Sequence, residues 1–398
     1  MTARPAAPGT PGVLFIVNSL ETGGAEKQVV SLINNLDVRR FRLHLAYLKR
    51  NEKLLPQLRQ ERLAMLLCCD VARRVDGNAI RRLRELIVGS GIDVVVCTNE
   101  YSTLYGRLAL RGGPEAKLVT VFHSTVLRGF KERAQMLLYR QLFNRSDLLV
   151  YVCESQRAYW RERGMRPKAD EVVYNGIDTE YFTDRRSNEE RRAFRRSLGL
   201  RDEDYVVGLC SVLRAGKAHG DLLAALSRLR SEDVPAKALL IGDGPERGAI
   251  ERTVSQLGLQ DHVLITGLQQ DVRPFVGACD VMALVSHSEC FSLAALESLS
   301  LGKPMVMSNV GGAAELVAHG EHGFLFEPGD IDALASHLRM LTSRPLREQF
   351  SRAAALRIRE RFTVGVMSER FADRIDRLRT ERAFSAGGSE HARSHRIA

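Results

Sequence analysis

The sequence of 398 residues lacks long apolar runs, has no Cys-x-x-Cys pair and is only 6% aromatic. Its apolar runs are about one strand long, whereas a membrane span needs roughly 18 residues. The first twelve residues are rich in Pro, Gly and Ala and lack the apolar core of a signal peptide. We therefore expect a soluble cytoplasmic protein, with any membrane contact being peripheral and at the inner face.

The cysteines and histidines give no sign of a metal site. Seven cysteines stand mostly in apolar runs, at positions 68, 69, 97, 153, 210, 279 and 290. Their odd number and their spacing favour reduced core residues over zinc ligands or disulfides. The ten histidines include no His-Glu-x-x-His pattern. We expect no cofactor and no metal.

The chain is basic, with 58 Lys and Arg against 48 Asp and Glu, a net charge of +10. This favours an acidic partner such as a nucleotide, an anionic membrane surface or nucleic acid. Nucleic acid is the weakest of the three, because no recognised motif or aromatic platform accompanies the charge. A P-loop NTPase is also excluded, since no Gly-x-x-x-x-Gly-Lys-Ser/Thr occurs.

Short apolar runs alternate with amphipathic stretches, which is typical of α/β proteins whose parallel sheets are covered on both faces. The predicted strands of a first series are 13–18, 42–47, 65–69, 93–97, 118–122, 148–152 and 171–174, and those of a second are 205–210, 237–241, 262–265, 280–284 and 304–307. The repetition predicts two doubly wound, Rossmann-like domains with a cleft between them, and ligands beyond the carboxyl ends of the strands.

The expected division places a hinge near residues 178–204. The expected parts are a flexible start (1–11), a first domain (12–180), a second domain (181–362), a helix that returns to the first domain (363–380) and a basic, disordered tail (381–398).

Two loops of the first domain are candidates for ligand contact. Gly23 and Gly24 follow the first strand and precede a helix predicted from Gln28, so backbone N–H groups there favour an anion. An ordinary tight turn is the alternative. His123 ends a strand, and we expect its imidazole to point into the cleft and contact a sugar or the acceptor. A packed or solvated histidine is the alternative.

In the second domain, Arg214 and Lys217 stand between a strand and a helix predicted from about His219. A planar fork beside a compact charge suits two adjacent phosphates, although a solvated turn has the same composition. Gly242 begins the next loop, Gly-Asp-Gly-Pro. Its spacing only loosely matches a dinucleotide fingerprint, and no acidic residue ends the following strand, which argues against a nicotinamide dehydrogenase.

The richest stretch begins at Glu289, just before a predicted helix, and includes Glu297 within that helix. A carboxylate in the apolar run around Glu297 needs hydrogen-bond donors, and the two hydroxyls of a ribose would supply them. Glu289 can accept from hydroxyls of a sugar, next to N–H groups that can face a diphosphate. The intervening donor-binding candidates are Cys290, Phe291, Ser292 and Leu293.

These motifs together resemble one family, the retaining family 4 (group 1) glycosyltransferases with the GT-B architecture. The resemblance covers residues 12–380 and rests on Gly-Gly-Ala-Glu (23–26), His123, Tyr-Asn-Gly-Ile-Asp (174–178), Arg214 with Lys217, Gly-Asp-Gly-Pro (242–245), the two glutamates and Gly-Gly-x-x-Glu (311–315). It implies that Glu297 binds the nucleotide ribose, Glu289 the donor sugar, and Arg214 with Lys217 the diphosphate. It also implies transfer with retention, without a metal, by front-face departure of the diphosphate.

The chain departs from the family pattern in the loop that is expected to bind phosphate. Members commonly carry an Arg two places before Arg214, where this chain has Val212. Cys290 and Ser292 stand where glycine is frequent. The role of Arg214 is therefore carried over only by its spacing to Lys217, whereas the two small residues still allow close approach to the donor.

The acceptor is less defined. Residues 126–145 mix Arg and Lys with large apolar side chains, which suits either a lipid-linked acceptor at an anionic membrane or an ordinary packed helix. The expected function is transfer of a hexose to a glycan, a lipid-linked sugar or a small molecule, in polysaccharide or glycolipid synthesis. A nucleotide-sugar epimerase on the same architecture and a non-catalytic nucleotide-sugar binder stay open.

Overall fold

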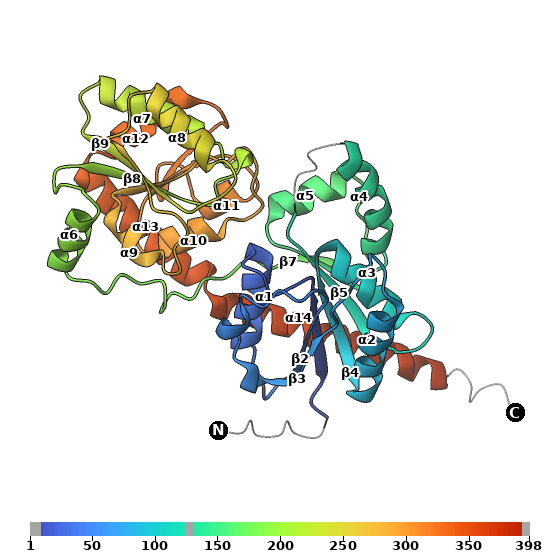
Figure 1. The fold of residues 1–398 in the computed structure, drawn as a ribbon. Helices are drawn as coiled ribbons and strands as arrows, with labels where there is room; N and C mark the ends of the chain where they lie inside the picture. The colour runs from blue at the N-terminus through green and yellow to red at the C-terminus, as the bar shows by residue number, and fades with distance from the viewer. Residues whose placement is uncertain (1–8, 125–129, 392–398) are drawn as a thin grey trace, which may run out of the picture. The chain divides into compact units, whose positions relative to one another are not determined.

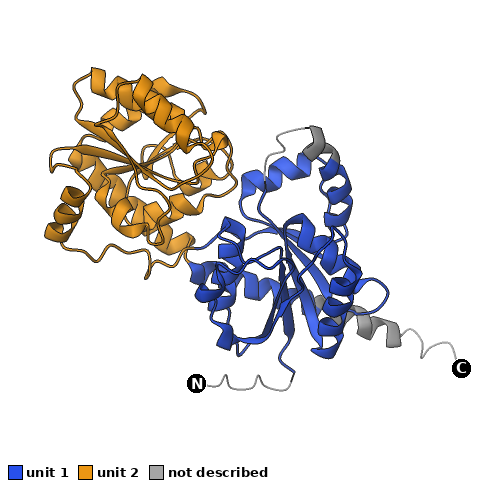
Figure 2. Ribbon diagram, in the orientation of Figure 1, with its two compact units in different colours: residues 1–176, 364–398 blue, residues 177–363 orange. Residues whose placement is uncertain are grey.

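The computed structural model describes residues 9–124 and 130–391 (Figure 1). The chain divides into unit 1, residues 1–176 with 364–398, and unit 2, residues 177–363 (Figure 2). The expected boundaries, after residues 180 and 362, lie within a few residues of this division. Helix α14 (Val364–His391) runs past residue 381, where the sequence analysis expected a disordered tail to begin. Residues 1–8 and 392–398 of the expected flexible ends lie outside the described residues.

Unit 1 is built on a sheet in which every pair of neighbouring strands is parallel. Its order is β3-β2-β1-β4-β5-β6-β7. The strands are β1 (Gly12–Val17), β2 (Arg42–Tyr47), β3 (Leu63–Cys68), β4 (Ile92–Thr98), β5 (Lys117–Phe122), β6 (Leu148–Tyr151) and β7 (Asp170–Val172). The chain order reverses between β1 and β4, which makes the edge above those two strands the place for a ligand.

Helices cover both faces of this sheet because side chains alternate along each strand. On one face Val13 and Phe15 pack with α1 (Gly24–Asn35) and α14, and on the other Leu14 and Ile16 pack with α2 (Gly77–Gly89) and α3 (Asn99–Leu110). Two further helices, α4 (Phe130–Phe143) and α5 (Glu154–Glu162), follow β5 and β6. Unit 1 therefore has three layers, with the sheet in the middle (Figure 1).

Unit 2 repeats this plan with the order β10-β9-β8-β11-β12-β13, again parallel throughout. Its strands are β8 (Tyr205–Cys210), β9 (Ala236–Ile241), β10 (Val263–Ile265), β11 (Val281–Leu284), β12 (Met305–Ser308) and β13 (Gly323–Phe326). Its helices are α6 (Asn188–Ser197), α7 (His219–Ser231), α8 (Arg247–Gln256), α9 (Arg273–Ala278), α10 (Leu293–Ser300), α11 (Ala313–Leu316), α12 (Ile331–Met340) and α13 (Arg344–Arg361). The reversal lies between β8 and β11.

The predicted fold class is confirmed, and the twelve predicted strands are all present with ends that differ by at most two residues. The sequence analysis missed β13, because four residues between turns show no clear periodicity. It also began the first helix four residues late: α1 starts at Gly24, so both glycines stand at its N-terminus.

Candidate functional site

The candidate site of unit 2 lies where the strand order reverses. Lys217 ends a short 3₁₀ turn after β8, and Glu289 lies in the loop after β11, so the two neighbouring strands bring them together. The Lys217 ammonium pairs with the Glu289 carboxylate, and both side chains are mostly buried. Ser286 donates to the same carboxylate oxygen at 2.7 Å. The structure thus joins two of the predicted catalytic residues into one hydrogen-bonded group.

Helix α10 begins four residues after Glu289, at Leu293. Ser292 is the N-cap of α10, and its hydroxyl accepts from the Ala295 N–H at 3.3 Å. Phe291 is buried and its ring lies 5.5 Å from the ring of Phe362, so only its backbone is left for a ligand. Cys290 and Leu293 are half-buried on either side. The N–H groups before the first turn suit an anion.

Close contacts between backbone segments fix the loops around Glu289. Gly311 has φ +56°, and a Cβ there would lie 2.3 Å from the Glu289 carbonyl oxygen. The Gly312 N–H donates to the Cys290 carbonyl at 2.8 Å. On the other side of β8, a Cβ at Gly242 would lie 2.0 Å from the Ser211 carbonyl oxygen. Only glycine fits these two positions, so the loops have one arrangement.

Arg214 stands apart from the Lys217–Glu289 pair. It is exposed and lines a cavity of about 150 Å³ between α7 and α8, together with His219 and Glu246. The position where the family commonly has Arg is taken by Val212, which is 49% exposed. Among the described residues, no hydrogen bond or ion pair joins the Arg214 side chain to Lys217 or Glu289.

Glu297 lies in the second turn of α10 and is half-buried. Its backbone carbonyl accepts from the Leu301 N–H at 3.1 Å, which closes the helix. Glu297 thus stands eight positions after Glu289, one in a helix and the other in the loop before it, as the sequence analysis expected.

In unit 1, the two predicted glycines form the start of α1. Gly23 is its N-cap in an extended conformation, and no side chain caps the helix there. The carboxylate of Glu26 folds back onto this turn, because a Cβ at Gly23 would lie 2.1 Å from its Oε2 atom. Burial raises the pKa of Glu26. The place expected for a ligand anion is thus occupied by a carboxylate of the protein.

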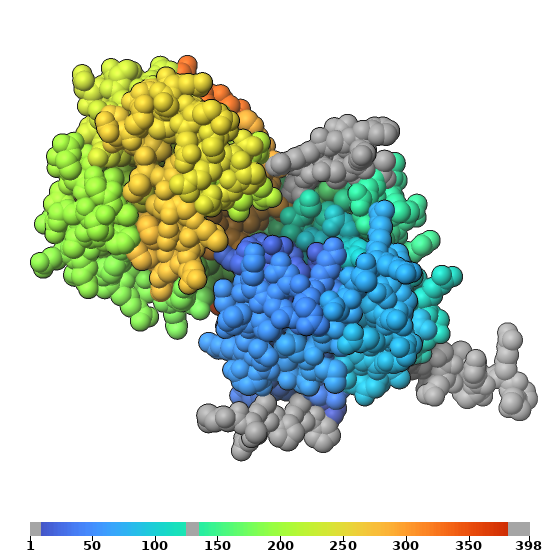
Figure 3. Space-filling view, in the orientation of Figure 1, coloured from blue at the N-terminus to red at the C-terminus, as the bar shows by residue number. Residues whose placement is uncertain are grey.

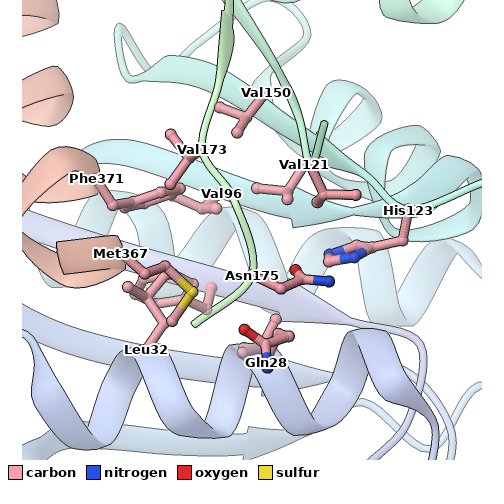
Figure 4. A pocket seen from close by; sticks show the side chains of 13 residues that line it. Gln28, Leu32, Val96, Val121, His123, Val150, Val173, Asn175, Met367 and Phe371 are labelled. Atoms are coloured by element: carbon pink, nitrogen blue, oxygen red, sulfur yellow. The ribbon is translucent and has the colours of Figure 1, made fainter. Parts of the chain in front are cut away.

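His123 lines a cavity of about 30 Å³ within unit 1 (Figure 4). His123, Asn175 and Gln28 lie at one end, and the remaining wall is apolar. The volume admits about two water molecules. Burial lowers the pKa of His123 to about 4, so its imidazole is neutral near pH 7. The sequence analysis expected this side chain to point away from the core; His123 is half-buried at the end of β5 and contributes to the lining of this cavity.

Three further residues were missed by the sequence analysis. Ser286 holds Glu289, as described above. Asn99, at φ +63°, accepts from the His123 N–H at 3.0 Å and so links the ends of β4 and β5. Glu100 follows it at the strand reversal of unit 1, and burial raises its pKa. The signal available for the last two was their position directly after a predicted strand.

The described ranges, 9–124 and 130–391, contain neither a cluster of metal-ligating side chains nor a helix suited to crossing a membrane. No three His, Cys, Asp or Glu side chains gather there as metal ligands would. No helix in those ranges has both the length and the apolar character that crossing a bilayer requires. Residues 125–129, part of the segment considered for the acceptor, lie outside the described residues.

Both units match known protein families. Residues 22–181 match the family described as Glycosyltransferase Family 4, and residues 190–357 match Glycosyl transferases group 1. The chain is 29% identical over 252 residues to N-acetyl-alpha-D-glucosaminyl L-malate synthase of Bacillus anthracis, covering 63% of this chain and 65% of that enzyme. It is 23% identical over 357 residues to an N-acetylgalactosaminyltransferase of Campylobacter jejuni that acts on a diphospho-undecaprenol substrate, covering 86% and 93%.

Solved structures agree on the fold. HepE of Anabaena in complex with UDP superimposes with a TM-score of 0.80 at 22% identity, covering 92% of this chain and 99% of HepE. Sucrose-phosphate synthase of Thermosynechococcus elongatus gives a TM-score of 0.77 at 18% identity, covering 93% and 100%. The chain therefore belongs to the family 4, group 1 glycosyltransferases and has their GT-B fold of two Rossmann-like units.

Proposed function

We propose that this protein is a retaining glycosyltransferase that moves a sugar from a nucleotide-diphosphate sugar to a hydroxyl of a glycan, a lipid-linked sugar or a small molecule. The observation that carries the proposal is the Lys217–Glu289 pair at the strand reversal of unit 2, beside the N-terminus of α10. Family membership supplies the reaction class. Relatives named as acting on L-malate and on a diphospho-undecaprenol substrate support the breadth of the acceptor class.

The donor side of the proposal assigns each residue a role. Lys217 and the N–H groups at the start of α10 balance the charge of the departing diphosphate, which is where preorganised donors act most strongly. Glu289 accepts hydrogen bonds from hydroxyls of the sugar, and Glu297 from those of the ribose. In the absence of ligand the ammonium and the carboxylate neutralise each other, and a bound donor supplies a partner for each. Arg214, being exposed, is assigned only an outer phosphate contact.

The first experiment measures the melting temperature of the full chain against a panel of nucleoside diphosphates and nucleotide sugars. We expect one nucleotide to stabilise the protein, and the effect to disappear in Glu297→Ala. Glu251→Ala, which removes an exposed carboxylate of α8 in the same unit, serves as the matched control. If no nucleotide stabilises the chain, the donor site is refuted.

Retention is tested on the product. With the donor identified, the configuration of the new glycosidic bond is read by NMR before it can equilibrate. The same anomeric configuration as in the donor supports the proposal, and the opposite one contradicts it. Turnover of the donor sugar without any acceptor would instead favour an epimerase-like enzyme, and binding without turnover would favour a non-catalytic binder.

We further propose that the acceptor is reached at an anionic membrane surface through α4. Leu137 and Leu138 are 58% and 70% exposed on this helix, and the exposed Arg145 follows its end. Apolar side chains beside basic ones suit the interface of an anionic bilayer. Leu137→Ser with Leu138→Ser should abolish flotation with phosphatidylglycerol vesicles. Leu356→Ser, at an equally exposed leucine of unit 2, should leave it unchanged, and equal flotation of both variants would contradict the proposal.

A further inference from the structure

A cluster of basic side chains stands at the carboxyl edge of the unit 1 sheet, where no role has been assigned. Lys49 follows β2, Arg73 and Arg74 follow β3, and Tyr101 lies in the first turn of α3, directly after β4. Because β3, β2, β1 and β4 are neighbours, these segments come from consecutive positions along one edge of the sheet. The segments after β2 and β3 belong to the blue and light-blue surface of unit 1 in Figure 3.

Tyr101 joins the members of this basic cluster. Its hydroxyl donates to the Arg74 carbonyl at 3.0 Å, which fixes the loop that carries both arginines. A second tyrosine of α3, Tyr105, accepts from the Asp76 N–H at 2.9 Å and holds the end of the same loop. The Lys49 ammonium lies 5.5 Å from the centre of the Tyr101 ring. The cluster is therefore positioned by side chains of a helix and not only by loop backbone.

The acidic groups of these loops are already engaged. Asp70 pairs with Arg50 at 3.4 Å, and Glu21 with Lys53 at 3.8 Å. Glu52 accepts from the Tyr47 hydroxyl at 2.6 Å, and the Asp76 carboxylate accepts from two N–H groups at the start of α2. Burial raises the pKa of Glu100, which favours its neutral form. In the described part of the chain no carboxylate lies within 4.0 Å of the three remaining cations, which are Lys49, Arg73 and Arg74.

The net charge of unit 1 agrees with this local excess of positive charge. Unit 1 has 35 Lys and Arg against 22 Asp and Glu, a net +13, whereas unit 2 has 23 against 26, a net −3. The positive charge of the protein thus belongs to the unit that is not expected to bind the diphosphate of the donor. This distribution favours an anionic partner for unit 1.

We infer that Lys49, Arg73 and Arg74, held by Tyr101, form a subsite for an oxyanion, a phosphate or carboxylate, carried by the acceptor. This inference rests on the proposed function for the reaction, and it narrows the acceptor to an anionic molecule. The two guanidinium groups supply forked donors and the ammonium a compact charge, the pairing that phosphate and carboxylate groups bind. A merely solvated basic surface would show neither saturation nor dependence on these particular side chains.

The test uses the full chain and glycerol 3-phosphate as the probe, with glycerol as the neutral comparison, at constant ionic strength. We expect saturable stabilisation by the phosphate and none by glycerol. In the double variant Arg73→Gln, Arg74→Gln the Kd should weaken about tenfold or more, since hydrogen bonds to a charged group are lost. Arg107→Gln with Arg111→Gln removes the same charge from the exposed end of α3 and should leave the Kd unchanged.

The outcomes separate this subsite from the donor site. If a nucleotide stabilises the wild type and both variants, but glycerol 3-phosphate acts equally on all three, the subsite is refuted and the proposed function stands. If no nucleotide acts on the wild type, the proposed function fails whatever the phosphate does. Loss of flotation with anionic vesicles, without loss of glycerol 3-phosphate binding, would assign the arginines to the membrane surface and overturn the inference. Lys49→Gln repeats the test should the double variant not fold.

Discussion

The two units share one topology but hold their strand-reversal edges in different ways. In unit 2, glycines allow close contact between backbone segments around Glu289, and Lys217 is already paired with the Glu289 carboxylate. In unit 1 side chains fix the edge: Tyr101 holds a loop with its hydroxyl, and in the described residues Lys49, Arg73 and Arg74 form no ion pair within 4.0 Å. The same fold thus carries one edge that is set by the backbone and one that is set by side chains.

This difference has a physical meaning. A loop locked by backbone contacts tolerates few substitutions and keeps one geometry, which suits a ligand part that never changes, such as a diphosphate. A surface built from side chains changes its preference with each substitution while the fold persists. Under the proposed function, the unit 2 edge serves the chemistry common to all donors, and the unit 1 edge serves the particular acceptor.

Breaking the pair in unit 2 should have the largest effect. Lys217→Met removes the ammonium to which the proposed function assigns the charge of the leaving group, and we expect kcat to fall about 100- to 1000-fold, as for loss of one preorganised donor. Activity is measured at saturating donor. Arg228→Met, which removes an exposed ion pair with Asp332 in the same unit, is the control and should keep its activity. A comparable loss in both variants would contradict a catalytic role for Lys217.

The next test concerns the close backbone contact between Gly311 and Glu289. Gly311→Ala places a Cβ against the Glu289 carbonyl oxygen at a φ of +56°, so it should both lower stability by more than about 1 kcal/mol and weaken donor binding. Gly320→Ala is the matched control, because its φ is +82° and no atom lies within 4 Å of its Cβ position. The control measures backbone strain alone. Equal donor affinity in the two variants would show that the contact between Gly311 and Glu289 does not determine donor binding.

Both units contain a histidine with a lowered pKa, which predicts that the stability of the protein is sensitive to acid. Burial lowers the pKa of His219 in unit 2, and of His123 in unit 1, to about 4, from an ordinary value of 6.5. The contribution of each histidine to the free energy of unfolding is then constant above pH 6.5. It falls between pH 6.5 and 4, because in that range only the unfolded chain takes up the proton. Between pH 7.5 and 5 the loss is about 2 kcal/mol for each histidine.

Melting temperatures measured across this pH range check the prediction. His219 is only 3% exposed, so His219→Gln should flatten the pH dependence of unfolding. His287→Gln, at an exposed histidine that meets Asp221, should not change it. If His219→Gln left the pH dependence of the melting temperature unchanged, groups other than His219 would cause the loss of stability in acid.

The smallest effect is expected in unit 1. Arg40 contacts three carboxylates on one side of α14, those of Glu369, Asp373 and Asp376, at 2.8, 3.1 and 2.7 Å. Arg40→Ala should cost about 1 kcal/mol, because a partly exposed network is worth only slightly more than one exposed pair. Chemical unfolding measures the change. Arg39→Ala, whose side chain is 89% exposed and meets only Asp37, should cost less, and an equal loss would contradict the network.

The sequence predicted the layers of the fold well because strands buried on both faces, such as Val94 to Val96, read as continuous apolar runs. It predicted Glu289 and Lys217 as functional, but not that they meet, since contact between residues 72 positions apart depends on which strands are neighbours. Arg214 shows the limit of an argument from spacing, because it precedes the 3₁₀ turn that ends at Lys217 and lines the cavity beside α7 and α8. The enclosed position of His123 depends on α14, from the far end of the chain.

The return of the chain to unit 1 affects the order in which the protein can be assembled. Ile177 and Phe362, near the two ends of unit 2, are joined by a backbone hydrogen bond of 2.8 Å, so unit 2 is one continuous insertion with adjacent ends. The core of unit 1, by contrast, includes six side chains of α14, from Val364 to Leu378. During synthesis, unit 2 has its whole sequence first, and the domain that begins the chain is the last to close.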